Sequence, residues 1–252
     1  MSRVLFSSFD PVAELYHRLW SGWYLTAALP ALEEVFFRRV PQGSKVLDLC
    51  CGSGHVTQEL VRRNYRVTGV DSSAGLLQIA RAELPGVDFR LQDARSLHLD
   101  ETFDAALSTF DSLNHILSLK DVERVFAAVH RCLRPRALFV SDMNRQEAFC
   151  ADLPGWSVEV GRDDTSLIRG SFDYEKKLAR TELIWFHREA ENGNHQCWRR
   201  IESAIEERCY EQQEIVDAAM RAGFQTVECV RAEQAGMDGR LGLGRIFFTA
   251  VR

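Results

Sequence analysis

The sequence predicts an α/β fold organised around a doubly wound, mostly parallel sheet, and two observations carry this prediction. Between about residues 45 and 142, short apolar segments alternate with amphipathic ones, a pattern typical of strands joined by right-handed helical crossovers. A buried strand that runs directly into a glycine turn is indicated by Val46-Leu47-Asp48-Leu49-Cys50-Cys51-Gly52-Ser53-Gly54. In such a sheet a ligand is expected at the carboxyl ends of the strands, next to that turn.

The elements of the first half follow from their local patterns. Residues 9–39 are helical in pattern, with Pro30 expected to begin a second helix and residues 41–43 to end it. Strands are expected at residues 45–49, 66–70, 87–91, 103–108 and 137–142. Helices are expected at residues 54–63 and 73–83, and a third is marked by the apolar face of Val122, Val125, Phe126, Val129 and Leu133.

The pattern changes at the Leu-Pro-Gly run of residues 153–155. Strand-like segments follow at residues 166–174, 178–188 and 196–207, joined by residues 173–176 and by the hairpin signal Asn192-Gly193-Asn194. This part predicts an inserted antiparallel sheet. A helix over residues 211–221 is expected to end at Gly223, and two last strands, residues 224–230 and 245–251, would complete the core.

Composition excludes several classes of protein. The chain has 252 residues and a formal net charge of −5, and no lysine or arginine run stands out, so a nucleic-acid partner is not expected. The seven cysteines match no paired or zinc-binding spacing, which indicates free thiols and no metal site. The N-terminus lacks a signal-peptide pattern and no apolar stretch is long enough to span a membrane, so a cytoplasmic protein without membrane contact is expected.

Details of the glycine turn decide which ligand it suits. A dinucleotide site needs three glycines, but Cys50 and Thr57 stand at the first and third positions, which disfavours a pyrophosphate. The run Asp48-Leu-Cys-Cys-Gly-Ser-Gly, with Asp71 closing the next strand, instead resembles motif I and its acidic successor in the class I S-adenosylmethionine-dependent methyltransferases. The alternative is an ordinary tight turn between a buried strand and a helix.

The resemblance implies a set of cofactor contacts. In that family the glycine turn lies against the methionine part of the cofactor, the acid after the second strand binds the ribose, and an acid after the third binds the adenine amino group. Alone, Asp93 also suits a solvated loop or a helix cap. The contacts implied for this chain are Asp48, Cys50, Gly52, Gly54, Asp71, Ser72, Asp93 and Ala94.

The acceptor side is expected after the fourth strand, in residues 108–115. Phe110 is a candidate to line the thioether of the cofactor, and His115 lies where related sugar N-methyltransferases place a histidine near the acceptor. A histidine near neutral pKa can take or orient a proton, so His115 is the catalytic candidate. Its alternative role is to cap or pack a helix. Asp111 and Asn114 are candidates to orient the acceptor, although both are common at helix starts.

Aromatic side chains mark two further regions. Tyr16, Trp20, Trp23 and Tyr24 cluster in the N-terminal helices; Tyr16 and Trp20 are candidates for a lid over the cofactor, with burial in the core as the alternative. In the inserted sheet, the candidates for a far wall of the acceptor pocket are Tyr174, Trp185, His187, Trp198 and Arg200. A dimer interface or a solvated sheet face would explain them equally well.

The family resemblance implies a seven-stranded sheet that ends on an antiparallel strand, plus the inserted sheet. It divides the chain into an N-terminal helical lid (residues 1–43), a cofactor-binding core (44–152), the inserted acceptor-side sheet (153–209) and the C-terminal part of the core (210–252). The run at residues 207–210 and the position of the insertion resemble small-molecule N-methyltransferases, including amino-sugar N,N-dimethyltransferases. O- and C-methylating relatives share much of this layout.

The function expected is transfer of a methyl group from S-adenosylmethionine to an N or O atom of a small molecule, with S-adenosylhomocysteine as product, by a monomer or homodimer. Residues 110–113, Phe-Asp-Ser-Leu, lack the Asn/Asp-Pro-Pro-Tyr/Phe turn of nucleobase and protein-glutamine methyltransferases, which argues against DNA methylation. Two alternatives stay open: a catalytically silent S-adenosylmethionine-binding or scaffold protein, and a nucleotide-dependent oxidoreductase.

Overall fold

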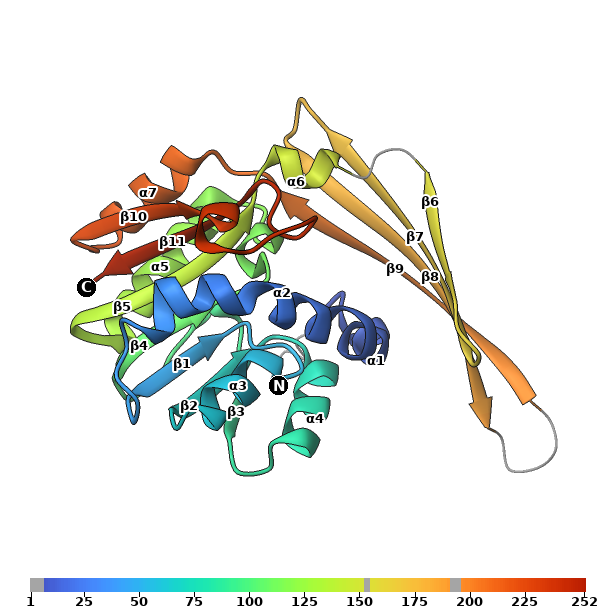
Figure 1. The fold of residues 1–252 in the computed structure, drawn as a ribbon, viewed down its shortest axis with the longest axis horizontal. Helices are drawn as coiled ribbons and strands as arrows, with labels where there is room; N and C mark the ends of the chain where they lie inside the picture. Colours follow the sequence, from blue (N-terminus) through green and yellow to red (C-terminus); the bar gives the residue numbers. More distant parts are fainter. Residues whose placement is uncertain (1–6, 152–154, 191–195) are drawn as a thin grey trace.

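The chain folds into two separate sheets, a seven-stranded one and a four-stranded one (Figure 1). This is a computed structural model that describes residues 7–151, 155–190 and 196–252. The four-stranded sheet projects from the α/β body as a long arm (Figure 1). The turn expected at Asn192-Gly193-Asn194 lies outside the described residues, as does most of the boundary expected at residues 153–155.

The large sheet has the spatial order β10-β11-β5-β4-β1-β2-β3. Its strands are β1 (Lys45–Leu49), β2 (Arg66–Asp71), β3 (Asp88–Leu91), β4 (Phe103–Ser108), β5 (Leu133–Asn144), β10 (Thr226–Arg231) and β11 (Arg245–Val251). The first five run parallel, whereas β11 is antiparallel to both β5 and β10. The predicted doubly wound sheet with an antiparallel last strand is confirmed. Strand order reverses between β1 and β4, and such a switch point opens a ligand crevice at the strand ends.

Helices cover both faces of this sheet. They are α3 (His55–Arg62), α4 (Ala74–Glu83), α5 (Leu119–Cys132) and α7 (Gln212–Arg221), with the short helix α6 (Gln146–Cys150) and the 3-10 turns η4 (Ala94–Ser96), η5 (Ser112–His115) and η6 (Ala232–Ala235). Alternate residues of β1 serve the two faces: Leu47 packs with Phe126 of α5, and Val46 with Leu60 of α3. This alternation is the period of two that a strand buried on both faces must have.

The second sheet consists of β6 (Trp156–Val160), β7 (Asp164–Asp173), β8 (Leu178–Ala190) and β9 (Gln196–Arg208), antiparallel throughout. The predicted inserted antiparallel sheet is therefore confirmed. Neither β6 nor α6 was expected from the sequence. Odd-numbered residues of β8 and β9 share one face, because Trp185 pairs with Ile201 and Thr181 with Ile205.

Five consecutive helical segments form the N-terminal region: η1 (Asp10–Val12), α1 (Ala13–Leu15), η2 (Tyr16–Ser21), α2 (Gly22–Leu32) and η3 (Glu33–Phe37). The expectation that Pro30 begins a helix is wrong, since Pro30 lies inside α2. A proline there removes one backbone hydrogen bond. The buried side chains of Ala28, Ala31 and Leu32 hold the segment in place despite that loss, and the wider π-helical turn η3 follows directly.

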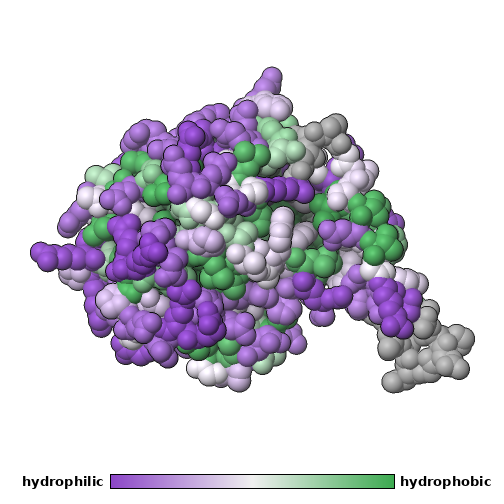
Figure 2. Space-filling view, in the orientation of Figure 1, coloured by the Kyte–Doolittle hydropathy of each residue, from purple (hydrophilic) through white to green (hydrophobic). Residues whose placement is uncertain are grey.

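The surface of the α/β body is mostly hydrophilic, and hydrophobic side chains gather over the arm around β6 and β7 (Figure 2). On β6, Trp156, Val158 and Val160 are all exposed. Among the residues that the structure describes, no helix combines the length and apolar character needed to cross a bilayer.

Candidate functional site

The glycine turn after β1 has a backbone that most residues avoid. Cys50, Gly52 and Gly54 have φ angles of 59°, 54° and 87°, in the left-handed region where a Cβ is unfavourable. Cys50 stands where the resembling family usually has glycine, and its φ explains that preference. The Gly52 N–H donates to Asp71 Oδ2 at 2.8 Å, and a Cβ at Gly52 would lie 3.5 Å from the Tyr16 ring.

Asp71, the last residue of β2, is fixed from both sides. Its Oδ1 accepts a hydrogen bond from the Ser73 N–H at 2.8 Å, and its Oδ2 accepts the one from Gly52. Burial raises the pKa of Asp71, while these backbone N–H groups lower it. A carboxylate offers about four lone-pair sites, so acceptor capacity remains for a ligand in the adjoining cleft.

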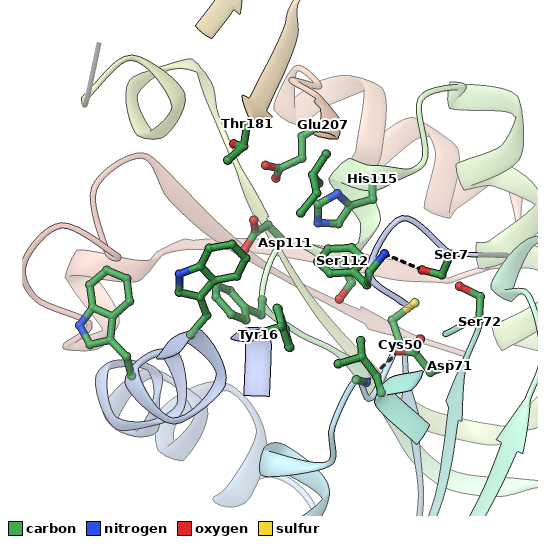
Figure 3. Close-up of a pocket in the computed structure, with 17 residues that line it drawn as sticks. Ser7, Tyr16, Cys50, Asp71, Ser72, Asp111, Ser112, His115, Thr181 and Glu207 are labelled. Carbon is green, nitrogen blue, oxygen red and sulfur yellow. Dashed lines mark hydrogen bonds between the residues drawn. The ribbon is translucent and has the colours of Figure 1, made fainter. Parts of the chain in front are cut away.

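A cleft of about 290 Å³ opens beside Asp71 and extends to β8 and β9. Figure 3 shows Cys50, Asp71 and Ser72 at one end, with His115 and Glu207 side by side at the other. Predicted residues that line it are Cys50, Gly52, Asp71, Ser72, Phe110, Asp111, Tyr16, Trp20 and His115. The residues that the sequence interpretation did not assign to it are Ser7, Phe9, Trp23, Leu76, Ser112, Thr181, Ile205 and Glu207.

A groove of about 240 Å³ continues from this cleft to the end of β3, and Asp71, Asp93 and Ala94 line it together with His115. Asp93 also caps η4, because its Oδ1 accepts the Arg95 N–H at 2.8 Å. The Arg95 guanidinium binds the same carboxylate and lowers the pKa of Asp93. The helix-cap role and the place at the ligand groove therefore coexist in one residue.

Asp48 lies in the body of the sheet and borders a small cavity of about 20 Å³ with Tyr16 and Phe110. Burial raises the pKa of Asp48 to about 7, although the Thr57 hydroxyl donates to its carboxylate. The structure does not bring Gly54 to any of these three cavities. A Cβ at Gly54 would lie 3.3 Å from Ala80, so this glycine allows α3 to approach α4 closely.

The loop after β4 is strained and firmly held. Phe110 and Asp111 have φ angles of 61° and 48°, which cost energy in residues other than glycine. Their N–H groups donate to the Asp142 carboxylate at 2.7 and 3.3 Å. Tyr24 also donates to Asp142, at 3.0 Å, and its ring stacks on Phe110 with centroids 4.3 Å apart. Buried Arg245 joins Asp142 to Asp111, the latter at 2.9 Å.

His115 ends η5, and its Nδ1 lies 3.3 Å from the backbone oxygen of Glu206. A neutral imidazole that donates from Nδ1 to this carbonyl has Nε2 as an acceptor. Burial lowers the pKa of His115, although the charge of Asp111 opposes the shift, so the neutral form is favoured at pH 7. The ring of Phe9 packs edge-on against the imidazole, with centroids 5.2 Å apart.

Glu207 is the functional candidate that sequence interpretation missed. Ligand atoms of Asp111, His115 and Glu207 all lie within 4.8 Å of one another. Glu207 Oε1 is buried and has no hydrogen-bond partner among the described residues. Burial and the nearby Asp111 raise the pKa of Glu207 well above its usual range. The sequence holds two signals: the run at residues 207–210 that resembles small-molecule N-methyltransferases, and strand alternation, which puts Glu207 on the same face of β9 as Ile205.

The predicted far wall of the pocket is wrong in its residues. The inserted sheet does face the cleft, but through Thr181, Ile205 and Glu207. The five aromatic and charged candidates lie elsewhere: Tyr174 and Trp198 are exposed, Arg200 pairs with Glu202, and Trp185 and His187 stack farther out along β8. Because Trp185 is four residues beyond Thr181 on the same face, it lies roughly 13 Å farther along the strand.

Asn114 has a structural role in place of the proposed contact with the acceptor. Its amide group donates to the backbone oxygens of Asn144 and Arg208 at 3.0 and 2.8 Å. The side-chain oxygen accepts the Asn144 N–H at 2.9 Å. Asn114 is fully buried and fastens the ends of β5 and β9 beside the cleft.

The N-terminal segment is fastened across the cleft at both sides. The Asp10 carboxylate accepts hydrogen bonds from the Ser73 hydroxyl at 2.6 Å and from the Gly75 N–H at 2.9 Å, at the start of α4. On the other side, the Arg18 guanidinium pairs with Asp164 of β7 at 2.7 Å. Tyr16 and Trp20 project between these two anchors and line the cleft.

Comparison with known proteins finds relatives that are described as methyltransferases. Residues 46–136 match the family described as "Methyltransferase domain". The protein YqeM of Bacillus subtilis is 26% identical over 221 residues, which cover 84% of this chain and 86% of YqeM. The ubiquinone biosynthesis O-methyltransferase of Xanthomonas oryzae is 30% identical over 199 residues, which cover 73% of this chain and 80% of the relative.

Solved structures share the fold. An S-adenosylmethionine-dependent methyltransferase from Clostridium acetobutylicum has a TM-score of 0.78 at 19% identity, covering 97% of this chain and 99% of its own. The sugar N-methyltransferase KedS8 from Streptoalloteichus has a TM-score of 0.78 at 20% identity, and the match covers 100% of this chain and 97% of KedS8. The amino pentose methyltransferase CalS10 from Micromonospora echinaspora, bound to S-adenosylmethionine, has a TM-score of 0.69 at 22% identity. The match covers 100% of this chain and 99% of CalS10. The chain therefore belongs to the S-adenosylmethionine-dependent methyltransferases, with S-adenosylmethionine as its cofactor.

Proposed function

We propose that this enzyme methylates a nitrogen atom of a small molecule. The observation that carries the proposal is the arrangement of the cleft, which joins the Asp71 turn to a cluster of hydrogen-bonding groups: Asp111, His115 and Glu207. KedS8 and CalS10, named as sugar and amino pentose methyltransferases, support an amine acceptor. The cleft volume of about 290 Å³ is at the lower end of those that enclose small molecules.

The residues beside the turn fit the cofactor. Asp71 has carboxylate acceptor positions left for the two ribose hydroxyls, Asp93 and Ala94 border the groove on the adenine side, and Gly52 lets a ligand approach its backbone. When bound, S-adenosylmethionine supplies a methyl group on a sulfonium, which is a good leaving group. The protein then needs mainly to align the acceptor and exclude water.

His115 is the residue proposed to act on the acceptor. Its Nε2 is the ring nitrogen left to accept a hydrogen bond when Nδ1 donates to the Glu206 carbonyl. A hydrogen bond to the acceptor N–H would direct the nitrogen lone pair towards the methyl group. His115 comes from η5, after β4, whereas the proposed ribose and adenine contacts follow β2 and β3.

The parts of the chain receive separate roles in this proposal. The described part of the N-terminal region, residues 7–43, forms a lid in which Tyr16 and Trp20 close over the cofactor, since both line the cleft. Residues 44–152 and 210–252 form the cofactor-binding core, and residues 153–209 supply the acceptor side through Thr181, Ile205 and Glu207.

Turnover with matched acceptors tests the proposal. S-adenosylhomocysteine formation is measured with a panel of small amino sugars and amino alcohols and with the alcohols that lack the amine. Product formation that needs the amine is expected. Turnover of the alcohols alone would establish O-methylation, the reaction in the name of the Xanthomonas relative. Tight S-adenosylhomocysteine binding without turnover across both panels would favour a catalytically silent protein.

A further inference from the structure

The cluster of Asp111, His115 and Glu207 contains more carboxyl groups than its surroundings neutralise. Arg245 is the buried cation that contacts Asp111 and Asp142. Asp142 is fully engaged, because it also accepts hydrogen bonds from Tyr24 and from the N–H groups of Phe110 and Asp111. Glu207 faces the cleft without such a partner for Oε1 among the described residues.

When two carboxyl groups share a buried site, the charge of one raises the pKa of the other, and the one beside a cation is the one that ionises. Asp111 is the one held ionised, since the Arg245 guanidinium lies 2.9 Å away and keeps the pKa of Asp111 below its usual value against the effect of burial. Glu207 therefore carries a proton when the cleft is empty. A ligand that brings a positive charge into the cleft would displace that proton.

We propose that Glu207, paired with Asp111, binds the ammonium form of the acceptor and takes the proton that the nitrogen must lose before methylation. This rests on the amine acceptor proposed above. In the step, an N–H bond of the ammonium breaks, its electron pair stays on nitrogen, and an O–H bond forms on the Glu207 carboxylate. One ammonium and one carboxylate give one neutral amine and one carboxylic acid.

The surroundings favour Glu207 over His115 as the proton acceptor. Burial lowers the pKa of His115 and raises the pKa of Glu207 well above its usual range, so both shifts favour the carboxylate over the imidazole as the group that takes a proton. His115 is then left to orient the amine. The same three side chains could also ligate a divalent cation. Arg245 already occupies Asp111 Oδ1, and its charge disfavours a dication beside it, whereas an ammonium carries only one charge.

Calorimetry on the protein saturated with S-adenosylhomocysteine tests the proposal. The probe is trans-2-aminocyclohexanol, compared with cyclohexane-1,2-diol, at about pH 6, where the free amine is protonated. Titrations in two buffers of different ionisation enthalpy report the protons exchanged. Binding of the amine is expected to release about one proton. Glu207→Gln should weaken the amine by about 10- to 100-fold, abolish the proton release, and leave diol binding unchanged.

Glu202→Gln is the matched control, since Glu202 is exposed on the other face of β9 and pairs with Arg200. It should behave as the parent does. Unchanged S-adenosylhomocysteine affinity verifies that Glu207→Gln is folded. If that variant does not fold, Glu207→Asp replaces it, with weaker amine binding and retained proton release expected.

Three results would overturn the proposal. Equal amine affinity and equal proton release in parent and Glu207→Gln would remove Glu207 from the site while leaving the amine acceptor intact. Amine binding that requires added Mg²⁺ or Mn²⁺, lost in Glu207→Gln, would make the cluster a metal site. Binding of the diol but of no amine by the parent would contradict the proposed amine acceptor itself, and the role of Glu207 with it.

Discussion

At the scale of single residues, the site concentrates backbone strain. Cys50, Phe110 and Asp111 all have positive φ angles and all border the proposed ligand space. Non-glycine residues persist in this region only where the surroundings hold them. For Phe110 and Asp111 the holding group is the Asp142 carboxylate, with Arg245 behind it. The strained loop thus depends on β5 and β11, far from it in the sequence.

Cys50 allows the strain to be measured. Because its φ is 59°, Cys50→Gly should be more stable than Cys50→Ala by about 1 kcal/mol, the cost of a Cβ in the left-handed region. Cys132 in α5 is the control, since in a right-handed helix the order reverses and alanine is favoured by about 1 kcal/mol. Urea unfolding of the four variants provides the comparison. The same order at both positions would contradict a strained Cys50.

Asp48 should give stability an unusual pH dependence. Burial raises its pKa in the folded state to about 7, above the unfolded value. A raised pKa stabilises the folded state at low pH, and this contribution is lost as pH rises from about 4 to about 7. Asp48→Asn removes the titration, so its free energy of unfolding should exceed that of the parent at pH 8 by about 4 kcal/mol. The difference in free energy of unfolding between variant and parent should disappear near pH 4. A difference that does not change with pH would contradict the raised pKa of Asp48.

At the scale of elements, the N-terminal helices join the two sheets. Val12 and Leu15 pack against Leu183 and Trp185 of β8, while Asp10 binds the start of α4. The lid proposed for these helices is therefore fastened at both ends. Its closure depends on a few polar contacts and one small apolar cluster.

Removing one anchor should loosen the lid. Asp10→Ala loses three hydrogen bonds, from Ser7, Ser73 and Gly75, so S-adenosylhomocysteine affinity should fall about 10-fold. Limited proteolysis within residues 7–15 should become faster. Glu14→Ala, an exposed neighbour on α1, is the control and should match the parent. Equal affinity and equal cleavage in Asp10→Ala would show that Asp10 does not anchor the segment.

Two tryptophans of the arm, one buried and one exposed, should differ in how much they contribute to the stability of the fold. Trp185 is 3% exposed beneath α1, whereas Trp198 is 48% exposed with Arg188 over its ring. Trp185→Ala should lower the free energy of unfolding by about 3 to 5 kcal/mol, and Trp198→Ala by about 1 kcal/mol or less. Neither residue lines the cleft, so acceptor use should not distinguish them. Similar stability losses for both would contradict the burial of Trp185.

Prediction from sequence worked where the local pattern and the tertiary structure agree. The bounds of β1, β4 and β11 were predicted as found, since each is a short apolar run between turn residues. Pro30 was misplaced because buried packing overrides its helix-breaking tendency. Strand β6 was missed because its residues are exposed and it pairs only with β7. Pairing with β7, and not a burial pattern in its own sequence, makes this segment a strand.

At the scale of the whole molecule, the site forms where two sheets meet. The Asp71 end could be predicted because motif, strand and acid lie within 30 residues of one another in the sequence. The other end could not, because Glu207 reaches the cleft only once the arm is placed, and Arg245 meets Asp142 across 103 residues. Local spacing carries no record of such contacts. The central claim is that the Asp71 end of the cleft binds the cofactor and the His115 end binds the acceptor.

Calorimetric titration with S-adenosylhomocysteine tests that claim most directly, using Asp71→Ala and His115→Ala. Asp71→Ala should weaken binding by about 2 to 4 kcal/mol, because two ribose hydroxyls lose a charged acceptor. His115→Ala should leave the dissociation constant nearly unchanged, while turnover of an accepted amine falls by less than the roughly 100-fold expected for a group that moves the proton, because His115 only orients the acceptor. Parental affinity in Asp71→Ala, or equal loss of affinity in both variants, would contradict the separation of cofactor and acceptor ends.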